Sequence, residues 1–149
     1  MIRLPVVLDG HPRPGRGAVR EIAFHQRTTD LVYAPNLDGD ADPGEVVWAW
    51  VPYEDDPSRG KDRPLLVVGR DGRALHAMML SSRAPEDHEE QDWLALGSGA
   101  WDREERASYL RLDRLFELDE DDIRREGAVL DATRFQAVAV ELHRRYGWR

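Results

Sequence analysis

The sequence predicts a mainly β (α+β) fold, a small closed or nearly closed barrel with a short helix and a C-terminal helix packed on it. Two observations lead to this prediction. Five segments rich in apolar, β-branched and aromatic residues follow one another between residues 45 and 118, with short turns between them, as in small antiparallel barrels. The chain then continues into a segment whose apolar residues recur at helical spacing, which predicts an amphipathic helix that covers one side of the sheet.

The bulk composition is that of one globular domain. The chain has 149 residues, which is enough for a sizeable core. It contains no cysteine, which excludes disulfides and thiolate metal sites and fits a cytoplasmic protein. The segment "MIRLPVVLDG" does not resemble a signal peptide, and no apolar run is long enough to cross a membrane. The net charge of -8 argues against a broad basic nucleic-acid surface, but not against a small basic site.

Residues 1–43 are expected to form an N-terminal extension that is partly flexible. The stretch "GHPRPGRG" is rich in proline and glycine, and "NLDGDADPGE" is a cluster of polar turn residues. We place the boundary before Gly44, so that residues 44–149 form the barrel domain. We expect the extension to be dispensable for folding.

The strands are expected in a simple order. "EVVWAWVPY" should end at Pro52 or mark a sheet edge there. "RPLLVVGR", which begins at Arg63, is a continuous apolar run typical of a strand buried on both faces. "DGR" predicts a hairpin turn into the third strand. The last three predicted strands are "ALHAMMLSS", "DWLALGSG" and "SYLRLDRLFEL".

Two helices are expected to follow. "LDEDDIRREG" has acidic residues in its first turn and Gly127 after its last, which predicts a short capped helix. Residues 131–147 have Asp131 as the expected N-cap. Their apolar residues lie at helical spacing, which predicts a face packed on the barrel: Phe135, Val138, Ala139, Leu142 and Tyr146.

Most of the polar clusters predict no site. Asp38, Asp40 and Asp42 alternate as in a calcium loop, but Pro43 and Ala49 stand where such a loop needs glycine and glutamate. The acidic run 119–122 is interpreted as a solvated helix cap. No pair of histidines has the spacing of metal ligands on one element. His76 is expected to be a satisfied core or rim histidine, and His143 a surface residue.

One constellation remains as a candidate site. Arg63 precedes a predicted strand, and Ser81 and Ser82 end the next one. A hairpin brings the start of its first strand near the end of its second. A guanidinium and one or two hydroxyls would then converge at the barrel rim and could bind a phosphate. Alternatively, Arg63 pairs with Asp62 or another acid, and the serines only end a strand. The pattern alone leaves both interpretations open.

The sequence from Gly44 onward resembles the MazF/PemK family of bacterial toxins. The matching pieces occur in the family's order: "GEVVW", then "PSRG", then "RPLLVV", then the hydroxyl pair "SS", then the tail "REGAVLDATRFQAVAVELHRRYG". The resemblance implies an SH3-like barrel, usually a homodimer, with metal-independent endoribonuclease activity and no cofactor. It also implies a cognate antitoxin as a partner, whose complex with the toxin binds DNA.

The resemblance also implies roles for residues. Arg63 matches the family's catalytic arginine and Ser81 its hydroxyl residue. Cleavage would use the RNA 2'-hydroxyl and leave a 2',3'-cyclic phosphate and a 5'-hydroxyl, so DNA should be inert. The substrate, single-stranded RNA, would be bound by Lys61, Asp62, Pro64, Ser82 and Trp50.

The sequence departs from the family pattern at several positions. Lys61 and Asp62 replace the family's Glu-Gln pair, which makes Asp62 a candidate general base. Ser81 replaces the commoner threonine, and "PYEDD" is inserted after the first strand. Residues 1–43 are an unusual extension, expected to cover the RNA groove or to replace part of the antitoxin contact. The alternative to a nuclease is a non-catalytic SH3-like interaction module.

Overall fold

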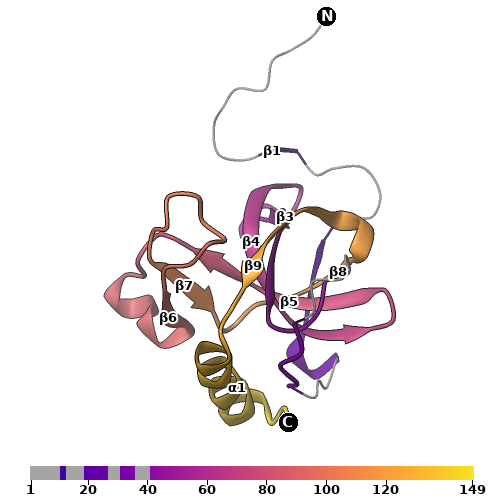
Figure 1. Ribbon diagram of the computed structural model, residues 1–149. Coiled ribbons are helices and arrows are strands. Elements are labelled where there is room, and N and C mark those ends of the chain that lie inside the picture. Colours follow the sequence, from indigo (N-terminus) through magenta and orange to yellow (C-terminus); the bar gives the residue numbers. More distant parts are fainter. Residues whose placement is uncertain (1–10, 13–18, 27–30, 36–40) are drawn as a thin grey trace, which may run out of the picture.

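The structure, a computed structural model, describes residues 11–12, 19–26, 31–35 and 41–149 (Figure 1). Asp38 and Asp40 lie outside the described residues. Within the described ranges, no helix could span a lipid bilayer. The strands are β1 (His11–Pro12), β2 (Arg20–Ile22), β3 (Glu45–Pro52), β4 (Arg59–Asp71), β5 (Ala74–Ser81), β6 (Trp93–Gly97), β7 (Ser108–Arg111), β8 (Leu115–Asp119) and β9 (Ile123–Val129). The helices are the 3-10 turns η1 (Phe24–Gln26), η2 (Asp87–Asp92) and η3 (Glu120–Asp122), and α1 (Ala132–Tyr146).

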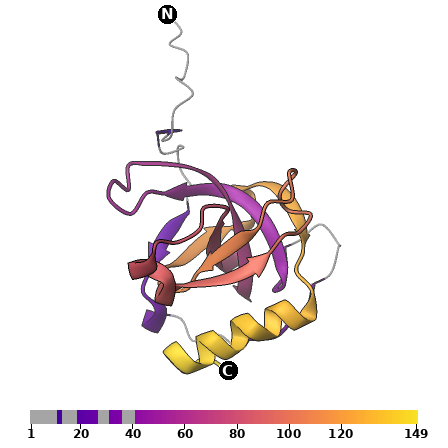
Figure 2. The ribbon, with the colours of Figure 1, turned by 90° about the vertical axis from the view of Figure 1, so that its left-hand side faces the viewer.

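The strands form a curved antiparallel sheet. Their order is β2-β8-β5-β4-β3-β9, while β7 pairs with both β5 and β6. Figure 2 shows α1 running along one side of this sheet. The predicted mainly β fold with a C-terminal helix is confirmed. The sheet curls like an SH3-like barrel but is not closed, since β2 and β9 stand at opposite ends of the strand order in the described chain.

The two faces of the sheet carry two separate cores, because successive strand residues point to opposite faces. Along β4, Leu65 and Val67 belong to the inner core, and Leu66 and Val68 to the core beneath α1. All four are fully buried. The predicted burial of this strand on both faces is therefore confirmed.

Helix α1 forms where the capping residues and the apolar stripe predict it. The Asp131 side chain accepts a hydrogen bond from the Arg134 N–H, and Gly147 ends the helix at φ 73°. Gly147 therefore supplies the left-handed conformation that closes a helix. Phe135, Val138 and Leu142 are buried against the sheet, as predicted.

Three element predictions need correction. Strand β4 begins at Arg59, so Arg63 and Pro64 lie inside it rather than at its start. A Cβ at Gly60 would lie 2.1 Å from the Val51 carbonyl oxygen, so glycine allows the close pairing that lengthens this strand. The predicted fifth strand is two strands, β7 and β8, separated by residues 112–114.

The predicted short helix over residues 118–127 is mostly a strand. Only η3 is helical, capped by reciprocal hydrogen bonds between Asp119 and Asp122. From Ile123 the chain pairs with β3, with register shifts at two places. The β3 edge offers backbone partners along the whole segment, and this long-range pairing outweighs the local helix signals.

Parts of the N-terminal extension pack against the barrel domain. Val19 is buried in the inner core and β2 pairs with β8. The Phe24 ring stacks on Tyr146 at a centroid distance of 3.7 Å, and the Tyr33 hydroxyl donates to the Leu130 carbonyl. These contacts disagree with the expectation that the whole of residues 1–43 is dispensable for folding.

The two histidines placed by the sequence lie as expected. His76 is 3% exposed on β5 and lies 3.2 Å from a Glu117 carboxylate oxygen, so it is a satisfied core residue. His143 is exposed on α1, and its Nδ1 lies 2.9 Å from the Trp148 carbonyl oxygen.

Candidate active site

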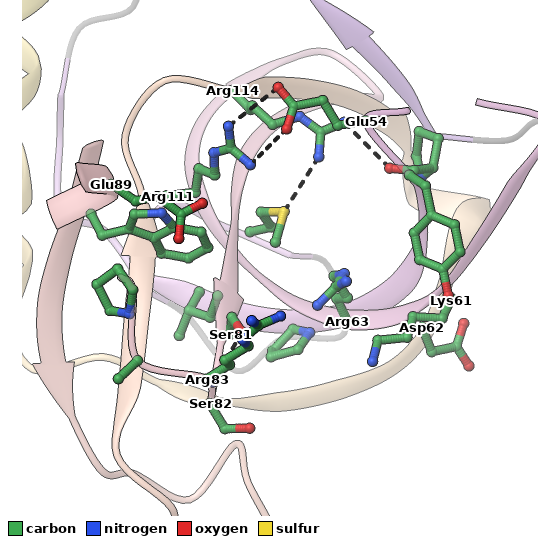
Figure 3. Close-up of a pocket in the computed structure, with 18 of the residues that line it drawn as sticks. Glu54, Lys61, Asp62, Arg63, Ser81, Ser82, Arg83, Glu89, Arg111 and Arg114 are labelled. Atoms are coloured by element: carbon green, nitrogen blue, oxygen red, sulfur yellow. Dashed lines mark hydrogen bonds and ion pairs between the residues drawn. The ribbon is translucent and has the colours of Figure 1, made fainter. Parts of the chain in front are cut away.

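A groove of about 810 Å³ opens at one rim of the inner core (Figure 3). Three segments supply most of its lining: β4, the end of β5 with the loop that follows, and the loop between β3 and β4. Its lining includes six cationic side chains, from Lys61, Arg63, Arg83, Arg106, Arg111 and Arg114, against five carboxylates, from Glu54, Asp55, Asp62, Glu86 and Glu89. The charges of the groove lining are thus nearly balanced, in a chain whose net charge is -8.

The strand register places Arg63 and Ser81 on the same face of the sheet. The β4–β5 pairing ends at Leu65 and Met79, and the same register continued by two residues would set Arg63 opposite Ser81 at the end of β5. Paired residues of antiparallel strands point to the same face. Both residues line the groove, just beyond the last inner-core residues of their strands.

A β-bulge selects Ser81 over Ser82. Near the hairpin turn, Asp71 pairs with Ala74 and Gly69 with His76, and this register would continue to set Arg63 opposite Ser82. Val68 is an extra residue in β4, so beyond it the pairing shifts by one. A shift of one residue exchanges the two faces of a strand. In Figure 3 the Ser82 hydroxyl accordingly points away from Arg63.

The Ser81 hydroxyl is oriented by its own turn. Its Oγ accepts a hydrogen bond from the Arg83 N–H at 3.1 Å. This leaves the hydroxyl proton available for donation to a ligand. A guanidinium and a hydroxyl donor on one face are a suitable pair for a phosphate oxygen.

The other residues predicted to bind substrate divide into two groups. Lys61, Asp62, Pro64 and Ser82 line the groove with Arg63. Asp62 is also 3.9 Å from Arg124 Nη1. Trp50 does not line the groove and is 4% exposed. Trp48, two residues earlier on the same face of β3, lines the groove instead.

The site also contains charged residues that sequence reasoning did not single out. Arg111 on β7 is ion-paired with Asp113 and Glu54, and its guanidinium lies 5.6 Å from the centre of the Trp93 ring. Burial opposes the charged form, but the two carboxylates outweigh it and raise the pKa of Arg111. The alternation of charged and apolar residues in "SYLRLD" indicated a strand face, but not where that face points.

Arg114 closes the inner end of the groove. Its side chain is 5% exposed, pairs with Glu21 at 2.8 Å, and donates to the Pro52 carbonyl oxygen at 3.3 Å. Its guanidinium also lies 4.8 Å from the centre of the Phe116 ring. These contacts tie β2 and β3 together beneath the groove, so Arg114 is part of its floor.

One cluster at the groove mouth has metal-ligating residue types. Ligand atoms of Glu86, His88 and Glu89 lie within 4.8 Å of one another. All three residues are at least partly solvent-exposed, and the two glutamates already form the capping box of η2. The capping role accounts for both carboxylates, and we assign no metal to the cluster.

Comparison with known proteins agrees with the fold. The sequence model of one protein family, the PemK-like, MazF-like toxins of type II toxin-antitoxin systems, matches residues 42–145 of this chain. One similar structure is an endoribonuclease in complex with its cognate antitoxin from a mycobacterial species (TM-score 0.52, 16% identity, 71% of this chain and 92% of that chain). Another is MazE-MazF from Deinococcus radiodurans (TM-score 0.52, 20% identity, 72% of this chain and 97% of that chain).

The two kinds of match carry different weight. At these identities the solved structures bear on the fold alone, and no curated protein sequence matches. The family model, in contrast, covers most of the chain. The chain therefore belongs to the family of PemK-like, MazF-like toxins of type II toxin-antitoxin systems.

Proposed function

We propose that the protein is a metal-independent, sequence-selective endoribonuclease that acts as the toxin of a type II toxin-antitoxin pair. Family membership supports a toxin of this type. The observation that supports RNA cleavage most strongly is that Arg63 and Ser81 share one sheet face and line one groove, together with five further cationic side chains. A groove whose charges are nearly balanced, on an otherwise acidic protein, is the less repulsive place for a polyanionic ligand.

In the proposed reaction, the 2'-hydroxyl of one nucleotide attacks the adjacent phosphorus and the bond to the 5'-oxygen breaks. The products are a 2',3'-cyclic phosphate and a 5'-hydroxyl. One proton leaves the attacking hydroxyl and another reaches the leaving oxygen. The Arg63 fork stabilises the extra negative charge on the phosphate oxygens, and the Ser81 hydroxyl donates to one of them.

The rest of the groove would hold the RNA strand. The indole rings of Trp48 and Trp93 line the groove and provide surfaces on which bases can stack. Lys61, Asp62, Pro64 and Ser82 would contact the strand next to the scissile phosphate. DNA lacks the attacking hydroxyl and should not be cleaved.

We also propose two protein partners. Family membership supports a cognate antitoxin that blocks the groove, and a homodimeric toxin. DNA binding is proposed for the toxin-antitoxin complex and not for the toxin alone, since the toxin has a net charge of -8.

The test is to incubate the purified protein with a long RNA of mixed sequence and map the new ends. We expect cuts at a recurring sequence, with cyclic phosphate and 5'-hydroxyl ends, in the presence of EDTA. A 2'-deoxy substitution at a mapped site should abolish that cut. RNA that stays intact across salt and pH would favour the non-catalytic interaction module.

A further inference from the structure

Arg111 presents a fixed guanidinium to the groove. Its side chain is 17% exposed. Nε and Nη2 donate to the two Asp113 oxygens at 2.6 and 3.2 Å. The ring of Trp93 lies beside the guanidinium, 5.6 Å from centroid to Cζ. A guanidinium held by a carboxylate and an aromatic ring loses little further freedom when it binds an anion.

The outer edge of this guanidinium is occupied by Glu54. Nη1 and Nη2 donate to the two Glu54 oxygens at 3.1 and 3.3 Å, as the dashed lines in Figure 3 show. Glu54 belongs to the loop between β3 and β4, and its side chain is 63% exposed. Two carboxylate oxygens and two non-bridging phosphate oxygens fit the same fork. An exposed ion pair is a weak one, so a phosphate can replace the carboxylate.

Arg111 shares a sheet face with the proposed scissile-phosphate site. Ser81 pairs with Tyr109 across β5 and β7, and Arg111 is two residues beyond Tyr109 on the same face. Two residues along a strand correspond to about 7 Å. An RNA strand with one phosphate between Arg63 and Ser81 therefore passes within reach of Arg111.

We propose that Arg111 is a second phosphate-binding position for the RNA strand, and that Glu54 occupies it until RNA displaces the carboxylate. The inference rests on the proposed function, because it takes RNA as the ligand. Glu54 thereby sets the affinity of the groove, and only a ligand with a correctly placed phosphate overcomes it. Glu54 lies in the inserted segment "PYEDD", to which this assigns a role.

The test is binding of a 2'-O-methyl RNA oligonucleotide, which cannot be cleaved, followed by fluorescence anisotropy over a range of salt. Glu54→Gln should tighten binding by roughly threefold to fivefold, as loss of an exposed competing ion pair predicts. Asp55→Asn is the matched control. It removes the same charge from the same loop and from the groove lining, but Asp55 makes no ion pair with Arg111. It should tighten binding clearly less than Glu54→Gln.

The reverse variant gives the second half of the test. Arg111→Gln should weaken binding and lower the salt slope by about 0.7, as the loss of one phosphate contact to a single strand predicts. Adding Glu54→Gln to Arg111→Gln should then tighten binding no more than Asp55→Asn does in the wild type. Glu54→Gln cannot be expected to unfold the protein, since the residue is exposed, so its comparison with Asp55→Asn stands even if Arg111→Gln folds poorly.

Three results would overturn the inference. If Glu54→Gln and Asp55→Asn tightened RNA binding equally, general charge repulsion would explain the effect and no specific exchange at Arg111 would be needed. A Glu54→Gln effect that persists in full without Arg111 would show that Glu54 does not act through Arg111. Tighter binding of a glutamate-rich peptide, with RNA binding unchanged, would assign the position to an acidic protein segment. Binding that follows these predictions in a protein that leaves RNA uncut would contradict the proposed function alone.

Discussion

The extra residue at Val68 decides which serine shares the sheet face of Arg63. Because the pairing shifts by one at this point, Ser81 shares the face of Arg63 and Ser82 does not. This β-bulge lies five residues after Arg63, and a search for catalytic residue types alone would not reveal it. It matters here because one residue of slip would turn the hydroxyl away from the arginine.

This register predicts different effects for two adjacent serines. Ser81→Ala should lower the rate of RNA cleavage by about 100-fold, as the loss of a donor to the developing charge predicts. Ser82→Ala should have a much smaller effect, and Ser81→Thr should retain most of the activity, because it keeps the hydroxyl. Single-turnover cleavage of a short RNA measures all three. Equal losses in Ser81→Ala and Ser82→Ala would contradict the register argument.

The sequence could predict some of these residues and not others. Arg63 and Ser81 belong to one hairpin, and the turn between them is marked in the sequence, so local geometry brings them together. Arg111 reaches the groove because β7 pairs with β5, and Arg114 meets Glu21 because β2 pairs with β8. Pairing across such sequence distances leaves no local pattern. Trp50 shows the same difficulty, since alternation does not tell which tryptophan the neighbouring strands cover.

At the scale of elements, α1 is held to the sheet by one apolar face. Phe135 of α1 is 2% exposed and packs against Tyr33, with ring centroids 5.3 Å apart. Phe135→Ala should reduce the free energy of unfolding by about 3–5 kcal/mol, through lost burial and a cavity. Chemical denaturation measures this loss, and an unchanged dependence of the unfolding free energy on denaturant concentration shows that only stability has changed. A loss below about 1 kcal/mol would mean that the helix is not packed as described.

The N-cap of α1 predicts a dependence of stability on pH. Hydrogen bonds from the Arg134 side chain and N–H lower the pKa of Asp131 from its ordinary value of 3.8. A lowered pKa in the folded state adds stability above pH 3.8, and this stability is lost as the pH falls through the folded pKa. Asp131→Asn keeps an accepting oxygen but does not titrate.

The measurement is the difference in melting temperature between the wild type and Asp131→Asn at pH 6 and at pH 3. The wild type should be the more stable at pH 6, and its advantage should shrink at pH 3. An advantage that stays constant over this range would show that the Asp131 charge does not contribute.

The elements differ in how well the sequence predicts them. α1 carries agreeing signals: a cap, a 3.6-residue stripe and a terminal glycine. The segment 123–129 carries local helix signals but becomes strand β9, because the β3 edge supplies its partners. Competition between local preference and long-range pairing is decided by the whole sheet, which explains why this prediction was wrong.

At the scale of the whole molecule, the family predicts a dimer. Sedimentation velocity at micromolar concentration should show a mass of about twice the 17.1 kDa of the chain. Trp50 is too buried to serve as an interface anchor, so any such role falls to Trp48 or Trp93, which are partly buried. A monomer across the accessible concentration range would contradict the prediction.

The distribution of charge also acts at this scale. The net charge of -8 repels nucleic acid from most of the surface, while the groove gathers six cationic side chains. RNA binding should therefore be local and strongly weakened by salt.

The central claim is that Arg63 carries the chemistry of this groove, and one measurement tests it most directly. The single-turnover rate of RNA cleavage is compared between the wild type, Arg63→Lys, Arg63→Ala and the control Arg73→Ala. Arg73 is 62% exposed and does not line the groove, and its replacement by alanine removes the same charge as Arg63→Ala. Arg63→Lys should slow cleavage by roughly 100-fold or more while it still binds RNA, Arg63→Ala should abolish cleavage in a folded protein, and Arg73→Ala should cleave like the wild type. Cleavage by Arg63→Ala at the wild-type rate would contradict the account.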